Sequence, residues 1–130
     1  MKQNVALTIA SLLSILFFTL HLADDIVLGF EKGGLPNLTA IPIAVLWLCG
    51  TIVLAGRRSG YIIVLIFSFL GMGIPVIHMS GKGIGIGSRV ADYSGQFFFA
   101  WTLIAMGVTT MFSVILSVRE LWRLRQAAVR

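Results

Sequence analysis

Two histidines and one aspartate are the residues whose types and spacing best suit metal chemistry. His21 and Asp25 stand four residues apart near the end of a long apolar segment, and His78 closes a later apolar segment. Residues four apart share one face of a helix, so His21 and Asp25 can hold one ion together. With His78 as the third ligand, the set would suit Zn²⁺ or Fe²⁺ and leave a position open for water or substrate.

The same histidines permit other interpretations. His21 and His78 could bind one haem b between two helices, as in a b-type cytochrome or a quinone-linked subunit. Alternatively, both are interfacial residues at wet helix ends and bind nothing, because a histidine and an aspartate at this spacing arise easily by chance. The sequence leaves a divalent metal, a haem and interfacial anchoring open.

Three further residues are candidates for ligand binding beside this set. Ser14 falls within about 40° of the histidine and aspartate of its own segment around an ideal helix. Asp24 is expected to point toward the loop that follows. Pro75 cannot donate to the carbonyl of Gly71, and Gly71 lies about 20° from His78 around the helix. We therefore expect a free carbonyl at Gly71 to face the pocket.

Composition places the chain in a membrane. Of its 130 residues, 58% are hydrophobic and 12% charged, and the mean hydropathy is +0.97, values far from those of a soluble domain. This length holds four spans with short loops. We therefore predict an all-α integral membrane protein, an antiparallel four-helix transmembrane bundle that forms a single domain over residues 1–130.

The hydropathy pattern gives four spans and a tail. The spans cover about residues 4–24, 40–56, 60–79 and 95–118, and a basic tail at 119–130 is predicted to rest at the lipid interface. The first segment is long for a secretory signal and three more follow, so it is predicted to be a span. A polar loop is expected at 24–39, and a short turn at 56–60 pairs the second and third spans.

Small residues indicate which face of the last span points inward. Thr102, Ala105, Thr109 and Ser113 share one side of that helix, and small residues allow helices in a membrane to approach closely. We expect this side to pack toward Gly71, with Thr110 on the opposite face.

Charge sets the orientation. Seven of the ten basic residues fall on one face: Lys2, Arg57, Arg58, Arg119, Arg123, Arg125 and Arg130. The positive-inside rule makes that face cytoplasmic, with both termini inside and the plasma membrane as the location. His21, Asp25, His78 and also Asp92 would then gather at the outer face.

These features favour binding over catalysis, although enzyme activity stays open. The predicted function is that of a small polytopic membrane protein, an accessory subunit or small-ligand binder with a polar pocket at the extracytoplasmic face. A metal-dependent membrane enzyme and a haem or quinone-linked subunit are the alternatives. The expected partners are the lipid bilayer and other membrane proteins or further copies. Nucleic acid is not expected, because the basic residues flank apolar runs.

Overall fold

A computed structural model describes residues 4–79 and 94–129 and is helical throughout its ordered elements, with no strand in these ranges. The elements in chain order are α1 (Val5–Val27), the 3₁₀ helix η1 (Leu35–Thr39), α2 (Ala40–Leu48), the π-helical segment η2 (Cys49–Val53), α3 (Arg58–Met79) and α5 (Ser94–Val129). Within these ranges, four stretches are long and apolar enough to span a membrane: Val5–Val27, Leu35–Val53, Arg58–His78 and Phe97–Val129.

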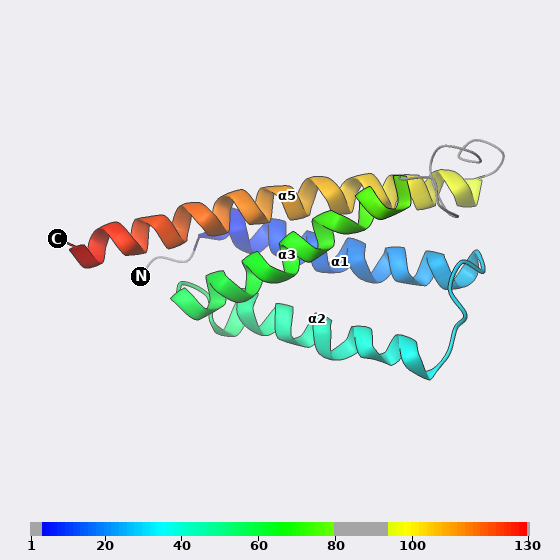
Figure 1. The fold of residues 1–130 in the computed structure, drawn as a ribbon, viewed down its shortest axis with the longest axis horizontal. Helices are drawn as coiled ribbons and strands as arrows, with labels where there is room; N and C mark the ends of the chain where they lie inside the picture. The colour runs from blue at the N-terminus through cyan, green and yellow to red at the C-terminus, as the bar shows by residue number, and fades with distance from the viewer. Residues whose placement is uncertain (1–3, 80–93, 130) are drawn as a thin grey trace.

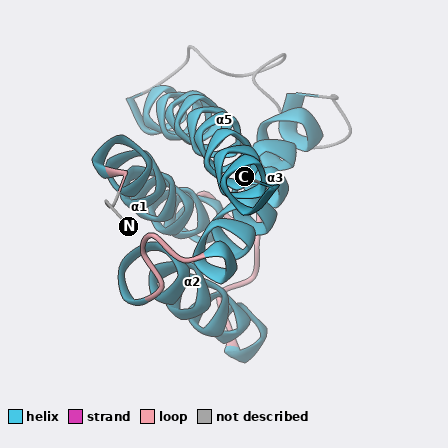
Figure 2. Cartoon of the chain, turned by 90° about the vertical axis from the view of Figure 1, so that its left-hand side faces the viewer, coloured by secondary structure: helices cyan, strands magenta, loops and turns pink. Residues whose placement is uncertain are grey.

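The helices form an elongated bundle in which α5 packs along both α1 and α3. Viewed from one end, α1 and α3 lie on either side of α5, and α2 lies on the far side from α5 (Figure 2). The start of α1, the turn between η2 and α3 and the end of α5 lie at one end of the bundle (Figure 1). The loop after α1 and the end of α3 lie at the other, and this arrangement places the end of α1 near the end of α3.

Helix α1 is longer than the sequence indicated. Asp24 and Asp25 were expected to begin a polar loop, but both are helical, and the helix ends at Val27. The backbone N–H of Leu28 donates to the carbonyl of Asp24 at 2.8 Å, which completes the last turn. Gly29 then takes a φ of 75°, a conformation that glycine adopts without steric cost, and the chain leaves the helix there.

The turn between η2 and α3 depends on two glycines. In η2, the N–H of Leu54 donates to the carbonyl of Cys49 at 2.9 Å, an i to i+5 bond. A Cβ built on Gly50 would lie 2.6 Å from Cγ2 of Ile63, and one on Gly60 would overlap the carbonyl oxygen of Leu54. Only glycine at both positions lets the two backbones come this close.

A buried hydrogen-bond cluster joins α1 to the second apolar stretch. Ser11 and Thr51 share a hydrogen bond of 2.7 Å between their hydroxyl oxygens, and the Trp47 indole N–H donates to the Ser11 hydroxyl at 2.9 Å. All three side chains are buried. The hydrogen bonds compensate the burial of these three polar groups.

The inward face of α5 differs from the predicted one. Thr110 was expected to face away from the bundle, but it is fully buried, and a Cβ on Gly71 would lie 3.0 Å from its Cγ2. The predicted stripe is only partly inward, since Thr102 and Ser113 are buried while Ala105 and Thr109 are half-buried. The buried face also carries Leu103 and Met106, so residue size alone did not identify it.

The basic tail is part of α5. The helix continues without a break to Val129, and 36 residues at 1.5 Å each give about 54 Å, against about 30 Å for a hydrocarbon core. Glu120 accepts hydrogen bonds from the Asn4 amide at 2.8 Å and from Arg123 at 3.2 Å. This contact ties the tail to the residue that caps the start of α1.

We predict that Gly60→Ala destabilises the fold by about 1–3 kcal/mol, because the added methyl group would overlap backbone atoms that cannot move independently. The free energy of unfolding, measured by titration with a denaturing detergent in mixed micelles, checks this. Gly73→Ala is the matched control, since a Cβ at Gly73 meets nothing within 4 Å. Equal losses in the two variants would contradict the close approach at Gly60.

Candidate functional site

His21, Asp25 and His78 meet at the end of the bundle where α1 and α3 finish. Nε2 of His21 lies 3.2 Å from Nε2 of His78 and 3.7 Å from Oδ2 of Asp25. One ligand atom from each residue lies within 4.8 Å of the other two. His21 and Asp25 are buried, with exposed fractions of 2% and 8%, and His78 is half-buried.

The chain after α1 fixes the position of Asp25. Its backbone carbonyl accepts hydrogen bonds from the N–H groups of Phe30 and Glu31, at 2.8 and 3.0 Å. The loop therefore folds back over the last turn of the helix. Because the backbone of Asp25 is held on both sides, its carboxylate stays on the same helical face as His21.

An aromatic wall from α5 supports both imidazoles. The ring of Phe99 lies 4.8 Å from that of His21 and 5.6 Å from that of His78, between ring centroids. Phe30 packs edge-on against Phe99 at 5.4 Å. Phe99 is itself buried against Leu103 and Met106, so one side of the site is a firm apolar surface.

Two buried polar atoms of the site have no hydrogen-bond partner among the described residues. They are Nδ1 of His21 and Oδ1 of Asp25. An unpaired buried polar atom costs about 1–3 kcal/mol, so native structures contain few of them. His21 and Asp25 therefore each keep one buried polar atom without a hydrogen bond, as Ser68 and Ser117 do elsewhere among the described residues.

A cavity of about 230 Å³ adjoins these groups. Among the described residues, its lining comes from α1 and α3: Phe18, His21, Leu22, Asp25, Ile74, Ile77 and His78. The volume is below the roughly 300–1,000 Å³ of pockets for drug-sized ligands. The site therefore suits an ion or a small part of a molecule.

The further candidates for ligand binding, predicted to lie beside His21, Asp25 and His78, are not among the residues that line this cavity. Ser14 is buried deeper in the bundle, where its hydroxyl donates to the Ala10 carbonyl at 2.8 Å and lies 3.4 Å from the hydroxyl of Ser113. Asp24 accepts a 3.4 Å hydrogen bond from Thr102 on α5. Gly71 packs against Trp47 and Thr110. Asp92 lies outside the described residues.

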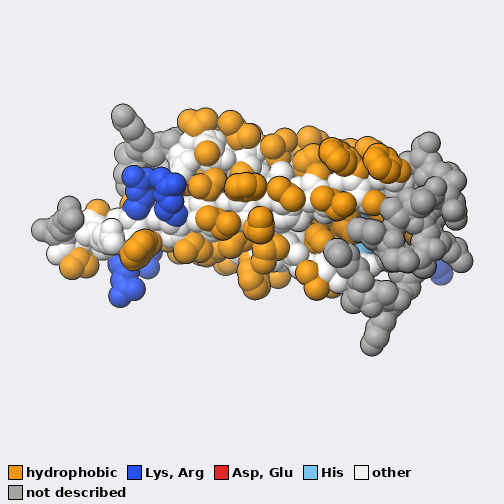
Figure 3. Space-filling view, turned by 90° about the horizontal axis from the view of Figure 1, so that it is seen from above, with side chains coloured by type: hydrophobic (Ala, Val, Ile, Leu, Met, Phe, Trp, Pro, Cys, Tyr) orange, Lys and Arg blue, Asp and Glu red, His pale blue; other side chains and the backbone are white. Residues whose placement is uncertain are grey.

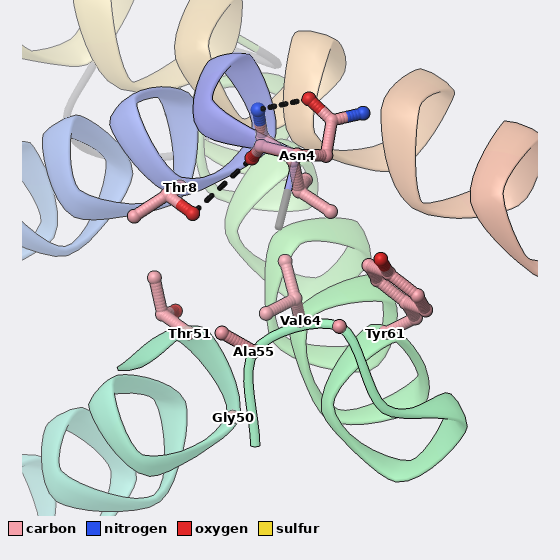
Figure 4. Close-up of a pocket in the computed structure, with 9 residues that line it drawn as sticks. Asn4, Thr8, Gly50, Thr51, Ala55, Tyr61 and Val64 are labelled. Carbon is pink, nitrogen blue, oxygen red and sulfur yellow. Dashed lines mark hydrogen bonds between the residues drawn. The ribbon is translucent and has the colours of Figure 1, made fainter. Parts of the chain in front are cut away.

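A second, much smaller hollow lies near the starts of α1 and α3, at the opposite end of the bundle. Figure 4 shows it in close-up. Its volume is about 10 Å³, enough for about one water molecule. Asn4, Thr8, Thr51 and Tyr61 are among its lining residues. No titratable ligand cluster accompanies it, within residues 4–79 and 94–129, so the His21, Asp25 and His78 site is the stronger candidate.

Sequence reasoning did not find Phe99 or Phe30. Phe99 is one of three consecutive phenylalanines, of which Phe97 and Phe98 are exposed. Composition cannot tell which of the three turns inward. The helical phase of α5 would have identified it, had Thr110 been placed on the buried face.

Comparison of the chain with known protein families, with characterised proteins and with solved structures found no match.

We predict that cysteines replacing His21 and His78 are joined efficiently by a short bifunctional thiol reagent, because their imidazole nitrogens are 3.2 Å apart. Gel mobility of the protein, with a protease site introduced between the two positions, measures the crosslink. Cys49 is replaced by alanine throughout. The control pairs position 21 with Val76, which is 66% exposed. Crosslinking as efficient in the control as in the test pair would contradict the geometry.

Proposed function

We propose that this chain is a four-span membrane protein that binds one divalent transition-metal ion in a pocket at its extracytoplasmic face. The observation that supports it is the convergence of two imidazole nitrogens and one carboxylate from α1 and α3 in a buried cluster. This narrows the small-ligand binder expected from the sequence to a specific class of ligand. The role is binding, as in an accessory or carrier protein.

The spacing of the donor atoms fits a tetrahedral ion. With metal–nitrogen bonds of about 2.0–2.1 Å, neighbouring ligand atoms stand about 3.3–3.4 Å apart. The two Nε2 atoms are 3.2 Å apart, and the His21 to Asp25 distance is 3.7 Å. The widest separation within the set, up to 4.8 Å, needs a side-chain movement of less than about 1 Å to bring all three onto one ion.

The donor types favour Zn²⁺ or Fe²⁺. Neutral imidazole suits borderline transition metals, whereas Mg²⁺ and Ca²⁺ prefer an all-oxygen shell. Two histidines and one carboxylate leave at least one position open. That open position supports a second candidate function, a metal-dependent membrane enzyme with the same three ligands.

The same distances argue against haem. Two axial histidines stand roughly 4 Å apart, twice a metal–nitrogen bond of about 2 Å, with the porphyrin between them. At 3.2 Å the two nitrogens instead share a hydrogen bond, and their rings meet edge-on at 80°. A porphyrin would have to separate α1 from α3.

The distribution of charge supports the membrane placement. Arg57, Arg58, Arg119, Arg123 and Arg125 are exposed at the end of the bundle where α5 finishes, and apolar side chains cover the middle (Figure 3). Lys32, Glu31 and the metal site lie at the other end. By the positive-inside rule, the arginine-rich end is cytoplasmic, the helices alternate in direction across the plasma membrane, and the pocket faces outward.

We predict that the purified protein binds about one Zn²⁺ per chain. The variants Asp25→Asn, His21→Ala and His78→Ala should each weaken Zn²⁺ binding by more than about 10-fold, because loss of even an outer-shell group costs at least that much affinity. Titration calorimetry and elemental analysis measure this. Affinity should fall as pH is lowered, because protons compete for the imidazoles. Asp24→Asn is the matched control and should retain affinity, since Asp24 bonds to Thr102. Equal loss in both asparagine variants would count against the site.

We also predict the orientation from cysteine labelling of intact cells. A cysteine at Leu35, which is 81% exposed, should react with a membrane-impermeant thiol reagent. One at Arg57 should react only after the cells are permeabilised, because arginines near span ends stay in the cytoplasm. The reverse pattern would place the pocket at the cytoplasmic face and leave the metal ligands unchanged.

A further inference from the structure

The cavity beside the metal site is polar at one end and apolar at the other. Along α1, Phe18 lies about one helical turn deeper than His21, and along α3, Ile74 lies about one turn deeper than His78. Leu22 and Ile77 complete the apolar walls. A metal ion would therefore stand at the outer end of a pocket whose floor and sides are hydrocarbon.

The pocket is larger than the ion needs. Its volume of about 230 Å³ is many times the roughly 10–15 Å³ that is needed to hold one water molecule, so it has room for several waters. Apolar walls offer such waters few hydrogen bonds, so filling the deep part with water is unfavourable. Methylene groups make favourable apolar contacts with these walls, whereas water molecules there lose hydrogen bonds.

Among the described residues, the pocket is lined by α1 and α3, and Ile77 in that lining is 71% exposed. We infer from this an opening to the side, between these two helices. In the membrane placement proposed above, such an opening faces the acyl chains of the outer leaflet. A molecule already dissolved in the bilayer can enter there without crossing water.

The charge of the site selects the head group of that molecule. A divalent ion with two neutral imidazoles and one carboxylate carries one net positive charge. An uncompensated charge in an apolar pocket is strongly unfavourable. A fourth ligand with one negative charge makes the site neutral, and a carboxylate oxygen is a normal ligand of Zn²⁺.

We propose that the pocket binds a fatty-acid-like amphiphile from the membrane, with its carboxylate at the open metal position and its first methylenes among Phe18, Leu22, Ile74 and Ile77. The rest of the chain leaves through the gap between α1 and α3. The inference rests on the proposed metal site, and it names the molecule that the site receives.

The test uses the full chain in phospholipid nanodiscs loaded with Zn²⁺. The probe is a fatty acid with a photoreactive diazirine near its carboxyl end, and mass spectrometry locates the adducts. Labelling should fall on the four apolar lining residues, require Zn²⁺, and be competed by decanoic acid but not by decanol, which has the same chain length and no charge. Chelation of Zn²⁺ should lower labelling by about tenfold or more.

Two tryptophan variants separate this proposal from the metal site. Ile74→Trp fills the floor of the pocket without removing a metal ligand, so labelling should be lost while Zn²⁺ binding persists. Ile66→Trp is the control, two turns away on the same helix and 52% exposed, and it should change neither. Should Ile74→Trp also weaken Zn²⁺ binding, the competition between decanoic acid and decanol on the unaltered protein decides.

Labelling that is independent of Zn²⁺, or that decanol competes as well as decanoic acid does, would overturn the carboxylate proposal and leave the metal site standing. Absence of Zn²⁺ binding to the unaltered chain would overturn both.

Discussion

The packing of α5 against both α1 and α3 is the contact on which the rest of the structure depends. Helices α1 and α3 make few contacts with each other, and each lies along α5 instead. Phe99 shows how this works at the end where α1 and α3 finish, since its ring contacts both His21 and His78. Two histidines 57 residues apart in sequence become neighbours because each rests on the same phenylalanine. The long helix therefore positions the site without contributing a ligand atom.

The helices pack more closely at one end of the bundle than at the other. At the end where α1 begins, Gly50 and Gly60 bring η2 and α3 into backbone contact, and Ser11, Thr51 and Trp47 share buried hydrogen bonds. These contacts leave a hollow of only about 10 Å³. At the other end, a cavity of about 230 Å³ remains between α1 and α3. A bundle that is firmly joined at one end can keep a gap at the other without losing its helix pairing, because packing in a membrane comes from local close contact and interhelical bonds.

The fold and the ligand set could be predicted from sequence to different extents. Hydropathy and length predicted helices that can span a membrane, because that signal is a property of composition. Helical phase placed His21 beside Asp25, and the shared end of two spans brought in His78.

The same phase argument failed for Ser14 and Gly71 as neighbours of the pocket, since it gives direction around a helix but not depth along the bundle. It also failed for Thr110, because the buried face of α5 includes large residues such as Leu103 and Met106. Phe99 lies about 20° from Thr110 around an ideal helix, so placing Thr110 on the wrong face also left Phe99 unidentified.

The adjacent aspartates show how the site is separated from its surroundings. Successive residues on a helix point about 100° apart, so Asp24 and Asp25 cannot serve the same site. Asp24 accepts a hydrogen bond from Thr102 on α5, whereas Asp25 lies beside His21 and keeps one oxygen unpaired. Water alone can supply the hydrogen bonds of a carboxylate at a membrane interface, and Asp24 also accepts one from the protein. Asp25 is buried at the edge of an apolar cavity with one carboxylate oxygen unpaired, which is unfavourable when the site is empty. A bound cation would make this burial favourable. The cation proposed for this pocket would account for the contrast between the two neighbouring aspartates.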